Sequence, residues 1–136
     1  MPNALYPKWK EALLQASANS SLGGTVRAVL IDAADYTYSA AHEFLTSVPG
    51  AARVGTPQTL GTKTFVDGAF DAADITFPTT TGDQAEAILI YIDTGTDATS
   101  RLVAYLDTGF TGLPVTPGGG DVTIAWDNGT NRIFRI

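Results

Sequence analysis

The sequence predicts an all-β fold, an antiparallel β-sandwich of jelly-roll-like topology with one or two short helices. Short apolar runs alternate with turn residues along most of the chain, as in sandwiches and barrels. The run Ala85–Ile92 is apolar at nearly every position, so it needs cover on both faces. With 136 residues, the chain is long enough for one domain with a core of its own.

A helix is predicted over Leu5–Ala18, where apolar residues recur at helical spacing. Tyr6 and Trp9 fall near one face of this helix, and Pro7 suits its first turn. The polar, glycine-containing stretch Asn19–Gly24 then ends it.

This break divides the chain into a short N-terminal segment and a single domain. We expect residues 1–24 to form an N-terminal arm or helix and residues 25–136 to form the β-sandwich.

The first predicted strand is Thr25–Ile31, which contains a continuous apolar run. A second short helix is predicted over Ala40–Val48, because Ser39 is a suitable N-cap. A turn at Gly55-Thr56-Pro57 is expected to divide Ala51–Val66 into short strands.

Further short strands are predicted at Ala69–Phe70 and Ile75–Phe77. The strand beginning at Ala85 and the strand Arg101–Leu106 flank the polar loop Asp93–Ser100. This order predicts a hairpin whose first strand is central in its sheet.

The end of the chain contains a strong local hairpin signal. Asn128-Gly129 lies within the turn Asp127–Asn131, between the apolar runs Val122–Trp126 and Ile133–Ile136. Both residues of an Asn-Gly pair tolerate positive φ, so we expect a hairpin here and a chain that ends inside the sheet.

Composition excludes several classes of function. The formal net charge is −6 with only eight basic residues, which disfavours nucleic acid as a partner. Cysteine is absent, which rules out disulfides and thiolate metal sites and fits a reducing cytoplasm. No apolar run approaches the roughly 18 residues that span a bilayer, and Met1–Ala4 does not open a leader pattern. We therefore expect no membrane partner.

The tripeptide Asp-Thr-Gly occurs twice, at Asp93-Thr94-Gly95 and Asp107-Thr108-Gly109. Aspartic proteases pair two such loops so that facing carboxylates share a proton. The copies here are too close in sequence to head two equivalent lobes, whereas Asp, Thr and Gly are common where strands end in turns. We therefore expect turns at both positions.

His42 is the only histidine, and Ser39 lies nearby without a nucleophile elbow around it. A lone histidine among dispersed aspartates is a weak basis for a metal site. We therefore expect no catalytic residues, no metal and no cofactor.

The predicted N-terminal helix is the candidate for contact with a partner. Tyr6 and Trp9 offer large apolar area, and Lys8 and Lys10 add local positive charge to an acidic protein. The alternative is that the two aromatic rings dock on the chain's own domain.

The order of segments resembles a family of small virion proteins of tailed bacteriophages, the capsid cement (decoration) proteins of jelly-roll type. The segments that carry the resemblance are Thr25–Asp32, Asp35–Thr37, Glu43–Leu45, Val48-Pro49, Phe70–Phe77, Ala85–Tyr91, Gly112–Pro117 and Asp121–Asp127.

The resemblance implies a non-enzymatic protein made in the cytoplasm of a host bacterium. Many copies would bind the outside of the virion head and seal contacts between capsomers of the major capsid protein. A shell offers such sites at symmetry axes, so we expect a homo-oligomer, with a dimer favoured and a trimer as the alternative.

Other functions remain open from the sequence. A tail, neck or baseplate component of the same particle is one alternative. A carbohydrate-binding β-sandwich module is another, and an enzyme that uses the two Asp-Thr-Gly loops is the least favoured.

Overall fold

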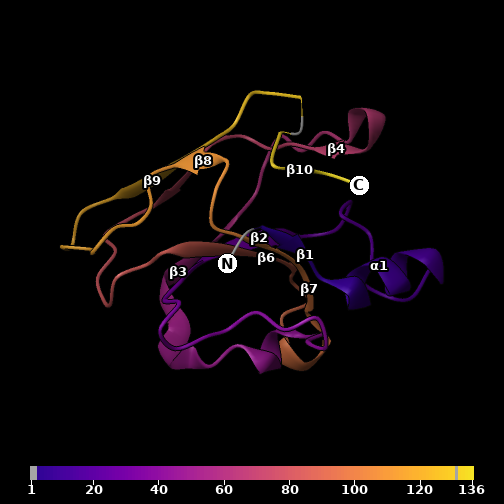
Figure 1. Ribbon diagram of the computed structural model, residues 1–136, viewed down its shortest axis with the longest axis horizontal. Helices are drawn as coiled ribbons and strands as arrows, with labels where there is room; N and C mark the ends of the chain where they lie inside the picture. Colours follow the sequence, from indigo (N-terminus) through magenta and orange to yellow (C-terminus); the bar gives the residue numbers. More distant parts are fainter. Residues whose placement is uncertain (1–2, 131) are drawn as a thin grey trace.

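The computed structural model describes residues 3–130 and 132–136, and antiparallel strands dominate it (Figure 1). One α-helix, α1 (Pro7–Leu14), lies near the start of the chain, and Pro7 occupies its first turn as predicted. None of the helices in the described part of the chain is long and apolar enough to cross a membrane. The predicted all-β, antiparallel sandwich-like fold is confirmed.

The largest sheet has five strands in the order β1-β7-β6-β2-β3. Its strands are β1 (Ala4–Leu5), β2 (Val26–Ile31), β3 (Arg53–Thr59), β6 (Ala87–Ile92) and β7 (Arg101–Leu106).

Two smaller sheets have the orders β5-β9-β8 and β10-β4. Their strands are β4 (Ala69–Phe70), β5 (Ile75–Phe77), β8 (Phe110–Thr111), β9 (Val122–Trp126) and β10 (Phe134–Arg135). Short turns of 3-10 type complete the chain: η1 (Leu45–Ser47), η2 (Gly50–Ala52), η3 (Val66–Gly68) and η4 (Asp97–Thr99).

The five-stranded sheet lies between two other layers. Figure 1 shows the smaller sheets on one of its sides, the segment between β2 and β3 on the other, and α1 beside the end of the sheet near β1 and β7. Cover on both faces explains why every residue of β6 is buried. β6 is the middle strand of this sheet, so the predicted central position of the strand is confirmed.

Several other predicted elements are found. β2, β4, β5 and β9 lie where the sequence predicts strands, and β6 and β7 form the predicted antiparallel hairpin. β2 pairs along the other edge of β6, from Val26 opposite Ile92 to Ile31 opposite Ala87. The core thus contains strands that are distant in sequence.

The predicted helix over Ala40–Val48 is wrong. Only the short η1 turn forms there, and the Ser39 hydroxyl accepts a hydrogen bond from the Ala41 amide within a tight turn. Phe44 instead forms an antiparallel bridge with Arg101, in which the Leu45 amide donates a hydrogen bond to the Ser100 carbonyl. This pairing with the start of β7 outweighs the local preference for helix.

The predicted hairpin between Val122–Trp126 and the final apolar run is also wrong. β5 and β8 occupy both edges of β9, so no edge is left for the last strand. β10 pairs instead with β4, with Phe134 opposite Phe70. The chain does end in a paired strand; Asn131, part of the predicted turn, lies outside the described residues.

Gly55-Thr56-Pro57 does not form the predicted turn, because β3 continues through it as a bulge. Ala28 pairs with Gln58 and Leu30 with Val54, so three residues of β3 oppose one residue of β2. Gly55 has a φ of 73°, and proline cannot donate to a sheet, so both residues suit a bulge at the edge of the sheet.

The N-terminal segment joins the main sheet. Ala4 pairs with Tyr105 and Leu5 with Ala104, so β1 extends the five-stranded sheet beyond β7. Of the predicted arm 1–24, residues 1 and 2 lie outside the described part of the chain.

Candidate functional site

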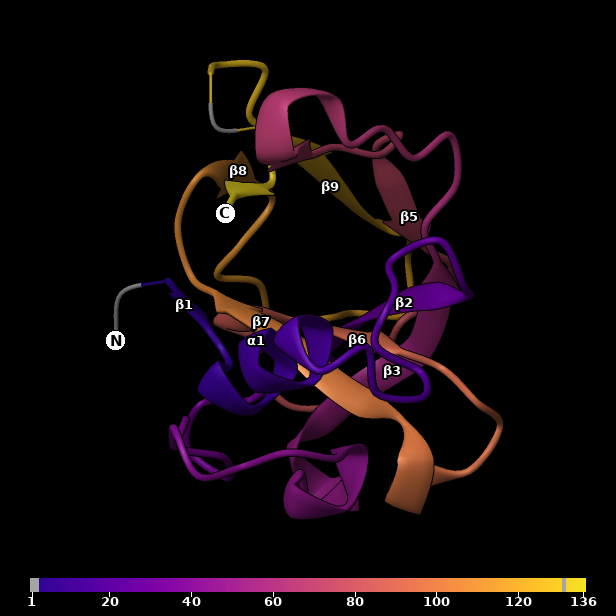
Figure 2. The ribbon, with the colours of Figure 1, turned by 90° about the vertical axis from the view of Figure 1, so that its right-hand side faces the viewer.

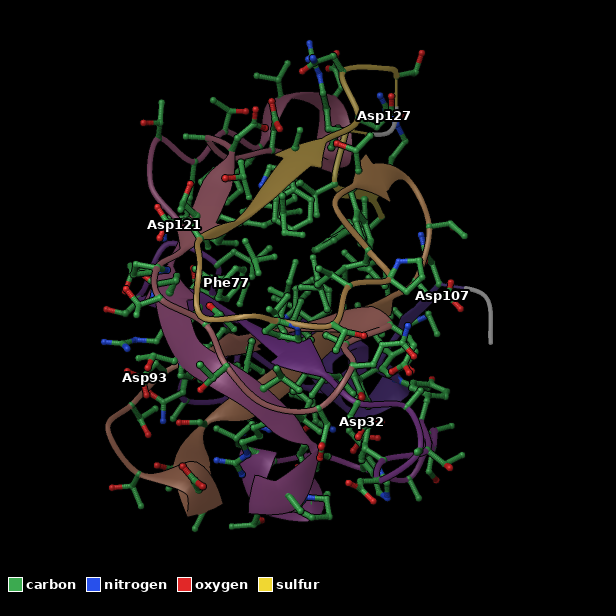
Figure 3. The ribbon with its side chains drawn as sticks, turned by 90° about the vertical axis from the view of Figure 1, so that its left-hand side faces the viewer. Asp32, Phe77, Asp93, Asp107, Asp121 and Asp127 are labelled. Atoms are coloured by element: carbon green, nitrogen blue, oxygen red, sulfur yellow. The ribbon has the colours of Figure 1, made fainter. Side chains whose placement is uncertain are left out.

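The two Asp-Thr-Gly loops lie at opposite ends of one hairpin. Asp93 follows β6 and Asp107 follows β7, and the two strands are antiparallel. Ile88 pairs with Leu106, so about five strand residues, roughly 16 Å, separate the two ends. Figure 3 shows the two aspartates on opposite sides of the molecule. The loops therefore cannot form a pair of facing carboxylates.

The first of these loops is a hydrogen-bonded turn. The Gly95 amide donates to the Asp93 carboxylate at 3.0 Å, and Gly95 has a φ of 86°. Asp93 also lies 3.1 Å from the guanidinium of Arg27. The Asp93 carboxylate thus stabilises the turn and forms an ion pair with Arg27 of the neighbouring strand β2.

His42 belongs to a chain of hydrogen bonds that reaches the core. Its Nδ1 lies 2.8 Å from the Tyr36 hydroxyl, which shares a 2.7 Å hydrogen bond with the Tyr6 hydroxyl. Ser39 contributes its hydroxyl to a local turn. These contacts tie the segment after β2 to the residue that precedes α1.

Tyr6 and Tyr36 of this chain of hydrogen bonds pack with two further tyrosines, Tyr38 and Tyr105. Ring centroids lie 4.9 Å apart for Tyr6 and Tyr38, and 6.1 Å apart for Tyr36 and Tyr105. Burial raises the pKa of all four hydroxyls, and the hydrogen bond to Tyr36 raises the pKa of Tyr6 further. The cluster is a neutral, packed group at physiological pH.

Three carboxylates gather in a place that sequence reasoning did not identify. Oxygens of Asp32, Asp35 and Asp83 lie within 4.8 Å of one another. Asp32 is buried, and it already accepts a hydrogen bond from the Ala34 amide. Calcium takes six to eight oxygens, so these residues alone supply only part of a cation site. Asp83 is distant in sequence from the other two residues, so no local sequence motif predicts that the three carboxylates lie together.

The four residues predicted to contact a partner divide into two kinds. Tyr6 and Trp9 are 0% and 1% exposed, because they pack into the chain's own core. Lys8 and Lys10 lie on the surface of α1, and Lys8 pairs with Glu11 at 3.5 Å. The two aromatic side chains thus offer almost no exposed area to a partner, whereas contact through the lysines stays a prediction.

Trp9 anchors α1 to the rest of the fold. Its indole N–H donates to the Ser20 carbonyl at 2.9 Å, and its ring meets Phe134 edge to face at 5.8 Å. The ring centroids of Phe134 and Phe70 lie 5.2 Å apart, and the stacked rings of Phe70 and Phe65 have centroids 5.8 Å apart. This series of rings connects α1 through β10 and β4 to the residue before the η3 turn.

Beside these rings lies an exposed apolar surface that sequence reasoning missed. Its members are the large hydrophobic side chains that remain exposed in the described part of the chain: Leu14 (90%), Phe65 (48%), Val66 (70%) and Ile136 (64%). We call these four residues the apolar face. Figures 1 and 2 show that α1, the η3 turn and the C-terminal strand lie on one side of the molecule.

A shallow groove passes beside two members of the apolar face, Phe65 and Ile136. It is lined by Trp9, Leu13, Leu22, Phe65 and Ile136, together with Ser21 and Gly23. Leu14 follows Leu13 along α1, and Val66 follows Phe65 into the η3 turn. No pattern in the sequence brings these segments together, since Leu14, Val66 and Ile136 come from three distant parts of the chain.

The apolar face is the candidate functional site. Phe65 and Ile136 are exposed beside one groove, and exposed apolar side chains gathered around a groove commonly mark interaction surfaces. Comparison of the chain with protein-family models and with curated proteins finds no match. The case for a function therefore depends on the residues and their arrangement.

Proposed function

We propose that this chain is a structural protein of a tailed-phage virion, a capsid cement protein that binds the outside of the head. It stabilises contacts between capsomers of the major capsid protein and has no catalytic role. The observation that carries the proposal is the ordered series of segments that resembles this family. Those segments correspond in part to strands β2, β4, β5, β6 and β9 of one sandwich-like fold.

The distribution of polar and apolar residues supports a role in binding. The core is filled by the chain's own side chains, including Trp9 and Phe77, which are almost fully buried. The apolar face offers exposed apolar surface for contact with another protein. A small protein that binds many equivalent sites on a shell can rely on modest individual contacts, particularly as a dimer or trimer.

Copurification with the particle tests the proposal. Mature heads and tails are separated from the phage that carries this gene, and the amount of the chain is measured relative to the major capsid protein. We expect a fixed stoichiometric ratio in the head fraction. Recovery with tails alone would support the tail, neck or baseplate alternative, and absence from both fractions would reject a virion role.

Stability of the shell provides the second measurement. Heads that lack the chain are expected to release DNA at a lower temperature than wild-type heads, and purified protein should restore the wild-type value. Heads with the same release temperature with and without the chain would contradict a cement function.

A further inference from the structure

The basic residues of this acidic protein fall into two groups. Five have a carboxylate within ion-pair distance: Lys8–Glu11 (3.5 Å), Arg27–Asp93 (3.1 Å), Arg53–Asp97 (2.9 Å), Arg101–Glu43 (3.3 Å) and Arg132–Asp71 (3.9 Å). The other three, Lys10, Lys63 and Arg135, have no carboxylate partner among residues 3–130 and 132–136.

All three of these cations border the apolar face. Lys10 precedes Leu14 by four residues on α1, which places both on one side of the helix. Lys63 donates hydrogen bonds to the carbonyls of Leu22, which lines the groove, and of Gly24.

Arg135 borders the face from the C-terminal strand. It precedes Ile136, and its guanidinium donates to the carbonyl of Asp67 in the η3 turn at 2.8 Å. The apolar face is thus a set of exposed hydrophobic side chains with a border of positive charge that the described residues leave without ion pairs.

A second copy of this chain fits the apolar face poorly. A two-fold contact would place the three cations of each copy around one shared surface. Of the side chains in α1 and the η3 turn, two of the segments that contribute to the face, only Asp67 is an exposed carboxylate outside an ion pair, since Glu11 pairs with Lys8. A head-to-tail contact would need large apolar side chains elsewhere, but within the described residues all of the exposed ones belong to this face.

We propose that the apolar face binds an acidic segment of the shell protein, in which apolar anchor residues are flanked by carboxylates. The inference rests on the proposed cement function and specifies its contact surface. Apolar anchors would fill the groove between α1 and the η3 turn, and the carboxylates would pair with Lys10, Lys63 and Arg135. Buried apolar anchors surrounded by polar contacts are the usual anatomy of such interfaces.

The series of aromatic contacts from Trp9 to Phe65 makes this surface rigid. It fixes α1 and the η3 turn relative to each other through Phe134 and Phe70. A rigid surface loses little conformational freedom when a partner binds, so more of the contact energy appears as affinity.

Binding to heads prepared without this chain tests the proposal. Purified wild-type protein and variants are titrated onto such heads, and the bound fraction is measured by sedimentation. Leu14→Glu places a carboxylate in the apolar face, whereas Thr123→Glu adds the same charge on the exposed side of β9, distant from α1 (Figure 1). We expect Leu14→Glu to weaken binding about tenfold or more and Thr123→Glu to change it by less than about twofold.

A second pair of variants tests the charged border. Lys10→Glu reverses a cation that has no ion pair among the described residues, whereas Lys8→Glu changes the same helix at a residue already paired with Glu11. The loss of affinity should be larger for Lys10→Glu, and wild-type binding should weaken as salt screens the border. Melting temperatures of all four variants verify that they fold.

The outcomes separate the two proposals. If the wild-type protein fails to bind heads, the cement function and this contact are both rejected. If it binds and Leu14→Glu binds equally well, or if Thr123→Glu is equally harmful, the cement function stands and the contact is rejected. If Leu14→Glu instead converts an oligomer of this chain into a monomer, the apolar face is a self-association surface and the proposal is wrong.

Discussion

Two groups of apolar residues lie close together at one side of this molecule and have opposite surroundings. Tyr6 and Trp9 are almost completely buried, whereas Leu14 and Val66 are 90% and 70% exposed. Burial makes the first pair a determinant of stability, and exposure makes the second pair available to a partner. In and around one short helix, the buried residues Tyr6 and Trp9 are therefore expected to stabilise the fold, and the exposed residues Leu14 and Val66 to contact a partner.

Residues of the first group hold α1 against the sheet. Removal of a side chain there should change stability, and binding should change only as a consequence. Residues of the second group contact water, so their removal should leave the fold unchanged. The following predictions test this division, from the largest expected effect on stability to the smallest.

Trp9→Ala should have the largest effect. The substitution removes a side chain that is 1% exposed, its hydrogen bond to Ser20 and its contact with Phe134. Replacement of a buried tryptophan by alanine costs about 3 to 5 kcal/mol of unfolding free energy. Denaturant unfolding monitored by circular dichroism measures it. A loss below about 1 kcal/mol would show that α1 is not anchored in this way.

Alkaline pH should destabilise the protein through its buried tyrosines. The pKa of Tyr6 is raised above its ordinary value of 10.0 by burial and by the hydrogen bond to Tyr36, and the pKa of Tyr91 is raised to about 12 by burial. The folded state therefore favours the protonated hydroxyls. Their contribution is complete below about pH 10 and is lost as the pH rises from 10 towards the folded pKa values.

Melting temperature measured between pH 8 and 12 tests this expectation. Tyr6→Phe should cost about 1 kcal/mol at neutral pH, because it removes the hydrogen bond to Tyr36, and should make the decline above pH 10 less steep. An equally steep decline in the variant would contradict a dominant role for Tyr6.

Leu14→Ser should have the smallest effect on stability. The side chain is 90% exposed, so its replacement should change the unfolding free energy by less than about 0.5 kcal/mol. Val66→Ser is expected to change the unfolding free energy by a similarly small amount, because Val66 is 70% exposed. The neighbouring residue Asp67, whose φ is 55°, is left unchanged by this substitution. A large loss of stability in either variant would place that side chain in the core and remove it from the proposed contact.

The strands with the clearest apolar patterns could be predicted from the sequence. β6 was identifiable because a two-sided apolar run needs cover on both faces, and the structure supplies that cover from the two smaller sheets on one side and the segment after β2 on the other. The hairpin from β6 to β7 is also a local feature. Prediction succeeds where sequence neighbours are also spatial neighbours.

The failures come from competition between distant segments. Ser39 is a suitable N-cap for a helix over Ala40–Val48, but pairing of Phe44 with Arg101 in β7 prevents the helix. The Asn-Gly signal near the end of the chain fails because β5 and β8 already occupy the edges of β9. Neither competition is visible in a local window of sequence.

The candidate site could be predicted only in its location. Tyr6, Lys8, Trp9 and Lys10 direct attention to α1, and this helix does border the apolar face. The helical pattern does not reveal that the two aromatic residues turn inward. Phe65, Val66 and Ile136 reach the same surface through the pairing of β10 with β4, which is a long-range event.

A cryo-electron microscopy reconstruction of decorated heads is the most direct test of the central claim. The orientation of each bound copy is read from the fit of its five-stranded sheet and of α1. We predict density for this chain on the outside of the head, with α1 and the η3 turn against the shell and β9 turned away from it. A copy bound through β9 with α1 in solvent, or a head without this density, would contradict the account.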